Sequence, residues 1–369
     1  MKKIVAVFGT RPEAIKMCPL VNELRFRDGV SVTVCVTGQH REMLDSVLHT
    51  FGVEPDADLD VMQEGQSLFD VTETILCRFR RVLEEEKPDL VLVHGDTTTA
   101  FAAALACYYM RIPVGHVEAG LRTYDTGSPY PEEFNRRAVE IISTYDFAPT
   151  EEARQNLIRE GKPESRIFVT GNTVIDALET TVRRDYTHPE LERIKRAGGR
   201  LVLLTAHRRE NLGEPMRRMF RAVRKTVESH PDVQVVYPLH PNPAVRAVAH
   251  EIFDGCDRIR LIEPLDVVDF HNFMAQSYLI LTDSGGIQEE APALSRPVLV
   301  MRDTTERPEG VAAGTLRLVG TGEKTIAREF ARLLDNRFEY SRMSHACNPY
   351  GDGHASQRIA DVIEELELD

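Results

Sequence analysis

Short apolar runs alternate with longer stretches of helical periodicity along most of the chain. In the first half, the runs of strand length are Ile4 to Phe8, Val32 to Val36, Leu90 to Val93, Pro113 to Val117 and Ile167 to Thr170. The helix-length stretches between them include Ala14 to Phe26, Leu68 to Glu86 and Glu132 to Ser143. Nearly continuous Val, Ile and Leu is typical of strands buried on both faces, so the alternation predicts a doubly wound α/β fold with a parallel sheet.

The pattern pauses in a charged stretch, Arg183 to Gly199, and then resumes. The later runs of strand length are Arg200 to Thr205, Val233 to Tyr237, Ile259 to Ile262, Leu279 to Thr282 and Val298 to Met301. Because 369 residues suit two domains, we predict one domain over 1–172 and a second over 173–353. A final amphipathic segment, 354–369, either closes the second domain or crosses back to the first.

Composition narrows the class of function. A net charge of −13 argues against a binder of nucleic acid or anionic membrane, although local cations can still hold a small anion. No stretch approaches the ~20 apolar residues of a membrane span, and the N-terminal run is too short for a signal peptide. The six cysteines are dispersed without a C-x-x-C pair, which predicts no zinc or redox motif and is typical of a cytoplasmic protein.

In open α/β sheets, ligands bind beyond the carboxyl ends of the strands, so the polar residues there are candidates for function. After the first run, Arg11 and Lys16 flank a helix start, where they form either an anion site or solvated basic residues beside a cap. Asp96 follows a later strand and is either functional or an N-cap. Glu118 ends an apolar strand between glycines, which packing explains poorly.

Glu132 opens a helix, where the helix dipole already favours an acidic residue. Asp96, Glu118 and Glu132 together supply several carboxylates, and crowded carboxylates shift each other's pKa values so that one serves as acid and another as base.

The second domain has a comparable set of loops. His207 follows a strand with two arginines beside it, which fits proton transfer or phosphate contact better than a surface cap. Ser284-Gly285-Gly286 leads into a helix and permits close approach of a phosphate, with Glu290 one turn on for ribose hydroxyls. Arg302 and Arg307 follow the next strand and suit a diphosphate, the alternative being an ordinary charged loop.

Seven motifs together resemble those of the non-hydrolysing UDP-N-acetylglucosamine 2-epimerases. They are Phe8-Gly-Thr-Arg-Pro-Glu-Ala-Ile-Lys16, Gln39-His-Arg-Glu-Met-Leu44, His94-Gly-Asp-Thr-Thr-Thr99, Gly115-His-Val-Glu-Ala-Gly-Leu-Arg122, Asp283-Ser-Gly-Gly-Ile-Gln-Glu-Glu290, Arg302-Asp-Thr-Thr-Glu-Arg-Pro-Glu309 and Asn348-Pro-Tyr-Gly-Asp-Gly353. The likeness extends from Lys2 to the final helix. It implies a glycosyltransferase-B-type fold, in which two Rossmann-like domains surround a deep cleft and helix 354–369 returns to the first domain.

The resemblance implies reversible epimerisation at carbon 2 of UDP-N-acetylglucosamine, giving UDP-N-acetylmannosamine for surface polysaccharide synthesis. UDP is eliminated to leave a bound 2-acetamidoglucal and is then added back. The proton at carbon 2 has no adjacent carbonyl, so cleavage of the glycosidic bond must generate the cationic character that loosens it, which requires carboxylates and a cationic clamp. The resemblance also implies a homodimer, with no metal and no cofactor.

The resemblance assigns roles to individual residues. Asp96, Glu118 and Glu132 become the acid, base and charge-stabilising carboxylates, without a choice of which takes the proton, and His207 lies near the diphosphate. The positions that match substrate contacts are Arg11, Lys16, Asp96, Glu118, His207, Phe270, Ser284, Gly285, Gly286, Glu290 and Arg307. Those that match a neighbouring regulatory site are Gln39, Arg208 and His240.

Three positions depart from the family pattern: Tyr130 stands in place of Trp, Leu265 in place of a nucleotide-contacting Gln, and Glu42 in place of Gln. The last of these leaves the strength of regulation open. Three rival functions share the fold: a hydrolysing epimerase that releases UDP and N-acetylmannosamine, a retaining glycosyltransferase, and a regulator that binds a nucleotide sugar without catalysis. The carboxylates after the strands disfavour the regulator.

Overall fold

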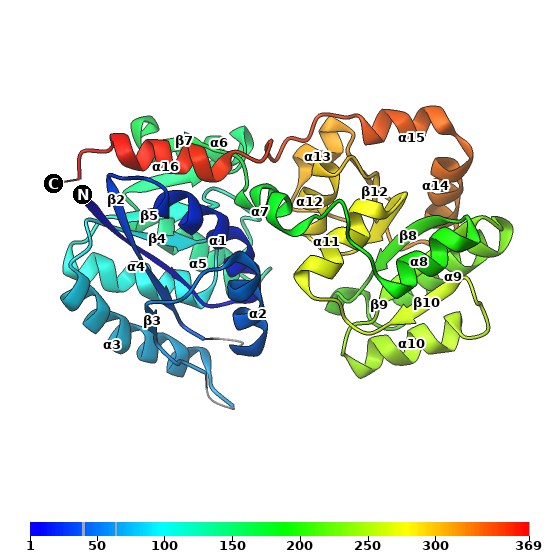
Figure 1. Cartoon of the computed structure of the whole chain (residues 1–369), viewed down its shortest axis with the longest axis horizontal. Coiled ribbons are helices and arrows are strands. Elements are labelled where there is room, and N and C mark those ends of the chain that lie inside the picture. The colour runs from blue at the N-terminus through cyan, green and yellow to red at the C-terminus, as the bar shows by residue number, and fades with distance from the viewer. Residues whose placement is uncertain (39–40, 63–64, 369) are drawn as a thin grey trace. The chain divides into compact units, whose positions relative to one another are not determined.

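The computed structural model describes residues 1–38, 41–62 and 65–368, without the side chains of residues 41 and 42. It forms two compact units, each built on its own sheet (Figure 1). Unit 1 comprises Met1–Thr180 together with the chain from Tyr350 onward, and unit 2 comprises Thr181–Pro349. From the sequence, these boundaries were expected after residues 172 and 353.

Unit 1 contains a seven-stranded sheet in the order β3-β2-β1-β4-β5-β6-β7, and its neighbouring strands pair in parallel. Its strands are β1 (Lys2–Phe8), β2 (Val30–Val36), β3 (Ala57–Asp58), β4 (Leu90–His94), β5 (Val114–Val117), β6 (Tyr145–Ala148) and β7 (Ile167–Val169). Its helices are α1 (Arg11–Arg25), α2 (Arg41–Phe51), α3 (Leu68–Glu86), α4 (Thr98–Met110), α5 (Glu132–Ile142), α6 (Glu151–Arg159), α7 (Thr173–Thr181) and α16 (Ala355–Glu365).

Unit 2 contains a six-stranded sheet in the order β10-β9-β8-β11-β12-β13, again with parallel pairing. Its strands are β8 (Arg200–Thr205), β9 (Val233–Pro238), β10 (Ile259–Ile262), β11 (Leu279–Thr282), β12 (Val298–Val300) and β13 (Leu316–Leu318). Its helices are α8 (Pro189–Ala197), α9 (Glu214–Ser229), α10 (Pro243–Phe253), α11 (Val267–Gln276), α12 (Ile287–Ala293), α13 (Pro308–Ala313), α14 (Glu323–Asp335) and α15 (Arg337–Ser344). The predicted α/β fold with two parallel sheets is confirmed.

The strand register decides which loops meet. In unit 1, Ala6 of β1 pairs with Leu92 of β4, and His94 at the end of β4 pairs with Val117 at the end of β5. The carboxyl ends of these strands therefore lie side by side. In unit 2 the strand order reverses between β8 and β11, and Thr205 pairs with Thr282 at their carboxyl ends. Such a switch point is where open α/β sheets bind ligands.

The charged stretch before β8 is a helix rather than an interruption in the pattern. Helix α8 lies there because its Leu191 and Ile194 are buried in the core of unit 2 while its charged residues face outward. Its C-cap, Gly198, has φ +70°, a conformation that glycine adopts at little cost.

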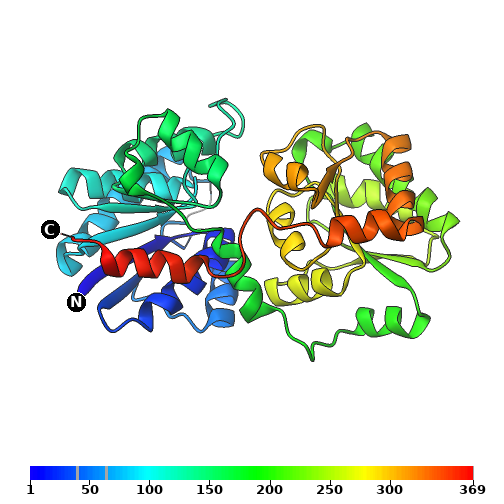
Figure 2. The same ribbon diagram turned by 90° about the horizontal axis from the view of Figure 1, so that it is seen from above.

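Helix α16 belongs to unit 1 and lies along α1 (Figure 2). Lys2 Nζ donates to the carbonyls of Ile363 and Glu364 at 2.9 and 2.6 Å. The carboxylate of Asp176 in α7 accepts from the backbone amides of Ala355 and Ser356 at 3.2 and 2.6 Å and so caps the start of α16. Among the described residues, no helix is both long and apolar enough to cross a membrane.

Candidate active site

The loop after β1 is organised by a buried carboxylate that the sequence analysis did not select. Glu13 accepts from the backbone amides of Gly9 and Thr10 at 3.1 and 2.7 Å, and from Thr97 Oγ1 at 2.7 Å. Burial raises the pKa of Glu13, although these hydrogen bonds oppose the effect. Glu13 thus ties the loop after β1 to the loop after β4 and helps to position Lys16 on the same helix.

Glu118 is the centre of the unit 1 cluster. Its side chain is 7% exposed and forms an ion pair with Lys16, while Asn172 Nδ2 donates to its Oε2 at 3.1 Å. His94 Nε2 lies 3.8 Å from the same oxygen. Burial alone would raise the pKa of Glu118, but Lys16, followed by His94 and Arg136, outweighs burial and holds that pKa well below its usual value. Glu118 is therefore an ionised carboxylate.

Arg136, in α5, joins the two carboxylates that follow neighbouring strands. Its guanidinium donates to the Asp96 carboxylate and to the main-chain carbonyl of Glu118, and it lies 3.5 Å from Glu118 Oε1. The backbone of Glu118 has φ +64°, the left-handed region that costs a non-glycine residue about 1 kcal/mol or more. From the sequence, Arg136 was expected only as one residue of the helix-length stretch Glu132 to Ser143, with no role of its own.

The sequence left a simpler explanation open for two of the acidic residues: Asp96 as the N-cap of α4, and Glu132 as an acidic residue favoured by the dipole of α5. Thr97, not Asp96, caps α4, since its side chain accepts from the Ala100 amide. The Asp96 carboxylate instead accepts a hydrogen bond from Arg136, and the Asp96 side chain is 31% exposed. In the first turn of α5, the buried Glu133 accepts from the amides of Thr123 and Tyr124, both at 3.0 Å. Glu132 is half-buried and starts the helix.

In unit 2, Asp283 anchors the loop that carries His207. Its fully buried carboxylate accepts from the backbone amides of His207 and Arg208 at 3.1 and 3.0 Å and from Asn211 Nδ2 at 3.0 Å. The His207 ring stacks on that of His240, with centroids 5.1 Å apart. Burial and the neighbouring His207 lower the pKa of His240. The loops after β8, β9 and β11 thus place two imidazoles together.

Two arginines converge over Gly285, directly after β11. A Cβ at Gly285 would lie 3.3 Å from Arg307 Nη1 and 3.4 Å from Arg208 Nη2. Arg307 Nε donates to the buried Glu289 at 2.7 Å, which fixes its guanidinium. Because both arginines reach the same glycine, the arrangement suits an anion that bridges them.

Arg302 forms an ion pair within its own loop. Glu306 accepts from its guanidinium bidentately, at 2.9 and 2.8 Å. Burial would raise the pKa of Glu306, but the hydrogen bonds and charge of Arg302 lower it to about 2. The ion pair therefore supports the loop after β12. Arg307 is the better candidate for a diphosphate because it lies beside Gly285.

The remaining residues of unit 2 lie around this loop. Glu290 in α12 is 3.6 Å from His271 Nε2. Phe270 and Leu265 are half-buried and pack against the core of unit 2.

The predicted residues fall into two clusters. Lys16, Asp96 and Glu118 come together in unit 1, and His207, Arg208, His240, Gly285 and Arg307 in unit 2. Within the described residues, no hydrogen bond or ion pair joins Arg11 or Glu132 to the unit 1 cluster. Gln39 lies outside the described residues. No group of His, Cys, Asp and Glu side chains in the described chain is arranged to hold a metal ion.

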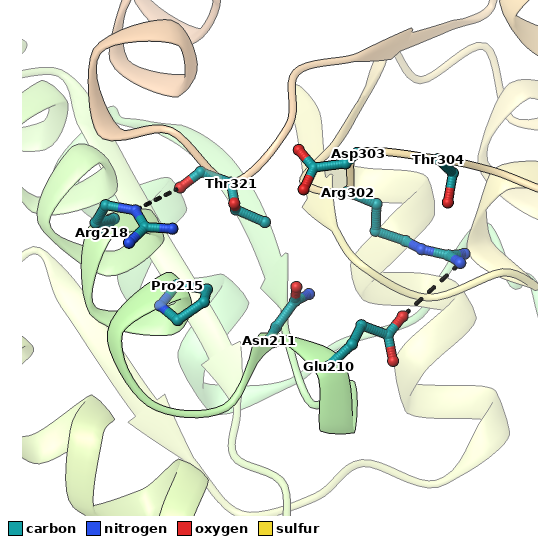
Figure 3. Close-up of a pocket in the computed structure, with 8 residues that line it drawn as sticks. All are labelled: Glu210, Asn211, Pro215, Arg218, Arg302, Asp303, Thr304 and Thr321. Carbon is teal, nitrogen blue, oxygen red and sulfur yellow. Dashed lines mark hydrogen bonds and ion pairs between the residues drawn. The ribbon is translucent and has the colours of Figure 1, made fainter.

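Unit 2 also contains a pocket of about 310 Å³ beside the loops after β8 and β12 (Figure 3). Its lining residues are Glu210, Asn211, Pro215, Arg218, Arg302, Asp303, Thr304 and Thr321. Arg302 Nη2 lies 3.8 Å from Glu210 Oε1 on one wall, and Arg218 Nε donates to the Thr321 carbonyl at 3.4 Å on the other. Neither Gly285 nor Arg307 lines it, so we do not assign the anion site to this pocket.

Comparison with known proteins identifies relatives along nearly the whole chain. The family model described as UDP-N-acetylglucosamine 2-epimerase matches residues 22–364. A UDP-N-acetylglucosamine 2-epimerase of Bacillus subtilis is 57% identical over 364 residues, covering 99% of this chain and 94% of the relative. The S. aureus MnaA–UDP co-structure is 52% identical, with a TM-score of 0.91 and coverage of 99% and 96%. The Neisseria meningitidis UDP-GlcNAc 2-epimerase bound to UDP-GlcNAc is 46% identical, with a TM-score of 0.91 and coverage of 99% and 100%.

Proposed function

The chain belongs to the UDP-N-acetylglucosamine 2-epimerase family, and from this premise we propose that it interconverts UDP-N-acetylglucosamine and UDP-N-acetylmannosamine without net hydrolysis. The observation that carries the proposal is the cluster in which Arg136 joins Asp96 to Glu118 while Lys16 pairs with Glu118. The Neisseria meningitidis relative bound to UDP-GlcNAc supports the substrate.

Residues of the two units have different roles toward this substrate. Arg208 and Arg307 of unit 2 bind the diphosphate beside Gly285, and Ser284 and Gly286 bring the backbone close to it. Glu290 and Phe270 contact the uridine half, and Arg11 and Lys16 add positive charge from unit 1. The carboxylates Asp96, Glu118 and Glu132 act on the sugar.

The reaction proceeds by elimination and re-addition. Cleavage of the bond between carbon 1 and the diphosphate oxygen leaves UDP and makes carbon 1 cationic, and the carboxylates stabilise this charge. A carboxylate then takes the proton from carbon 2, which gives the 2-acetamidoglucal. His207 assists the departing diphosphate. Return of a proton to the opposite face of carbon 2 and of UDP to carbon 1 completes the inversion.

Two measurements test this mechanism. In heavy water, the product acquires deuterium at carbon 2 because the abstracted proton exchanges with solvent, and a product without label contradicts elimination. Phosphorus NMR of the same reaction separates the two epimerase types. Diphosphate resonances of the nucleotide sugars persist if UDP is re-added, whereas steady accumulation of free UDP identifies a hydrolysing enzyme. No turnover, with UDP-N-acetylglucosamine still bound, identifies a regulator.

The carboxylate assignment is tested by Asp96→Asn, Glu118→Gln and Glu132→Gln. Each is expected to lower kcat by roughly 10²–10⁴-fold, the usual contribution of a general acid or base. UDP affinity, measured by calorimetry, stays near the wild-type value in Asp96→Asn and Glu132→Gln. Glu133→Gln does not serve as a matched control because Glu133 binds two backbone amides. Glu152→Gln, at an exposed position in α6, is the better control.

Three further assignments come with the family. We propose that Gln39 and His240, together with Arg208, which also binds the substrate diphosphate, form a regulatory site for a second nucleotide sugar. We further propose that the enzyme works in the cytoplasm for surface polysaccharide synthesis. We also propose a homodimer, supported by exposed apolar side chains on the adjacent helices α3, α4 and α5, namely Phe69, Tyr109, Phe134 and Ile141. Ile141→Glu is expected to shift the mass measured by light scattering from dimer to monomer.

A further inference from the structure

One oxygen of Glu118, Oε2, faces three different side chains. It is paired with Lys16 Nζ, accepts from Asn172 Nδ2 at 3.1 Å, and lies 3.8 Å from His94 Nε2. The first two are hydrogen-bonding contacts, whereas the third is just too long to be one. Lys16 is therefore the nearest of the three side chains to this oxygen, and His94 lies beside it without a hydrogen bond to it.

His94 is unusual among the residues of this cluster. Its side chain is 5% exposed, and within the described chain its buried Nε2 has no hydrogen-bond partner. Burial lowers the pKa of His94 to about 4, so the ring is neutral near pH 7 and with its proton on Nε2 is a donor. A buried donor without an acceptor costs about 1–3 kcal/mol, which a second arrangement with a partner would recover.

Two anionic groups compete for the charge of Lys16. One is the Glu118 carboxylate, and the other is the diphosphate that the proposed function assigns to the same ammonium. A lysine beside a carboxylate weakens it as a base, because the positive charge favours the ionised form. A doubly negative diphosphate competes strongly for such a compact charge.

We propose that Lys16 passes from Glu118 to the diphosphate of the bound nucleotide, and that His94 then donates its Nε2 hydrogen bond to Glu118 in its place. This inference rests on the proposed function. It makes His94 a positioning residue and makes Glu118 a stronger base only when nucleotide is bound. The other groups that face Glu118 keep their places: Asp96 from the loop after β4, Arg136 from α5 and Asn172 after β7.

The first test compares the pH dependence of kcat/KM, which reports the free enzyme, with that of kcat, which reports the complex. In the wild type, the acid limb of kcat is expected about one pH unit or more above that of kcat/KM, since Lys16 has left Glu118 in the complex. In Lys16→Met, the acid limb of kcat/KM moves up toward that of kcat. The proposal is overturned if the acid limbs of kcat and kcat/KM coincide in the wild type. It is also overturned if the acid limb of kcat/KM does not move in Lys16→Met.

A matched control removes a comparable ion pair elsewhere in unit 1. Lys162 Nζ lies 3.1 Å from the buried Asp146, and in the described part of the chain no hydrogen bond or ion pair joins either residue to Glu118. Lys162→Met is expected to leave both acid limbs where they are, provided that the variant folds by circular dichroism. A shift of the same size in Lys162→Met would assign the effect to lost stability and contradict the exchange.

Two variants of His94 test the donor itself. His94→Gln retains an N–H donor and is expected to keep kcat within about fivefold of the wild type. His94→Leu removes it and is expected to lower kcat by roughly 10²-fold with little change in KM, because the hydrogen bond orients Glu118 for proton transfer in the transition state. Equal losses in both variants would mean that His94 only fills space.

A direct titration separates this proposal from the proposed function. Carbon NMR of protein labelled at the glutamate carboxyls, with Glu118→Gln for assignment, follows the pKa of Glu118 without turnover. Addition of UDP is expected to raise that pKa in the wild type and to leave it unchanged in Lys16→Met. An unchanged pKa in the wild type, or no UDP binding, overturns the exchange even if the enzyme epimerises. A protein that shows the shift but makes no UDP-N-acetylmannosamine overturns only the proposed function.

Discussion

Arg136 holds Glu118 by its backbone, because its guanidinium donates to the carbonyl oxygen of that residue. Glu118 has a left-handed backbone at the end of β5, a conformation that a glutamate does not adopt by preference. The same guanidinium binds the Asp96 carboxylate. A single buried side chain therefore sets the spacing of two carboxylates and compensates for local strain.

Arg136→Lys should lower kcat by roughly 10²-fold while UDP affinity changes less than about twofold. A lysine brings one charged nitrogen and cannot bind the Glu118 carbonyl and the Asp96 carboxylate with a planar fork, so both carboxylates shift. Steady-state kinetics and calorimetry with UDP measure the two effects. Arg137→Lys, on the same helix with its side chain 43% exposed, is the control and should retain wild-type kcat. Equal activity in both variants would remove Arg136 from the mechanism.

Gly285→Ala should weaken UDP binding roughly tenfold, which corresponds to about 1.4 kcal/mol. The added methyl group would lie within 3.4 Å of both Arg307 Nη1 and Arg208 Nη2 and displace the two guanidiniums from the anion site. Calorimetry with UDP measures the change. At Gly322, φ is −83° and the nearest atom to an added Cβ is 3.9 Å away, so Gly322→Ala should bind UDP normally. Unaltered affinity in Gly285→Ala would place the diphosphate elsewhere.

Glu306→Gln should destabilise the protein at pH 7 but not at very low pH. The folded-state pKa of Glu306 is about 2 against a usual 4.5, so its stabilisation is present above pH 4.5 and is lost as the pH falls through about 2. A displacement of this size corresponds to at most roughly 3 kcal/mol at neutral pH. Urea unfolding at several pH values measures it, with the 82% exposed Glu263 as Glu263→Gln control. A difference independent of pH would show that the ion pair is not its source.

Gly120→Ala should lower the free energy of unfolding by roughly 2 kcal/mol more than Gly161→Ala. Both glycines have left-handed backbones, with φ +88° and +87°, so both substitutions carry the same conformational cost. Only at Gly120 would the new Cβ collide with backbone, 2.2 Å from the Ala153 carbonyl oxygen, whereas Gly161 has no atom within 4 Å. Denaturant unfolding compares the two. Equal losses would mean that α6 moves aside freely.

Most of the fold could be predicted because parallel strands are apolar on both faces. The run Leu279 to Thr282 coincides with β11, and Leu68 to Glu86 with α3. Strand β6 was missed because Asp146 interrupts its short apolar run. That carboxylate is tolerated because Ser143 donates to it at 2.6 Å and Lys162 lies 3.1 Å away, contacts that no local pattern reveals.

The candidate site could be predicted only in part. Strand ends indicated Asp96 and Glu118, because polar residues after apolar runs stand out. Arg136 did not stand out, since an arginine within an amphipathic helix is normally exposed. The sequence did not indicate His94, because it is the last residue of an apolar strand. Its unpartnered Nε2 could be recognised only from the structure, which places it beside Glu118 and Asn172. Roles that depend on contacts between distant segments needed the structure.

The return of α16 to unit 1 has a consequence for the order of events on the ribosome. Domains commonly fold in the order in which they are synthesised. Here Lys2 in the first strand and Asp176 in α7 both bind α16, which is translated only after all of unit 2. During synthesis, unit 2 is translated after most of unit 1, yet it is the first of the two units to have its complete set of contacts. The first 180 residues of unit 1 lack α16 at that stage, so the surface that binds α16 stays uncovered until the chain beyond Tyr350 emerges.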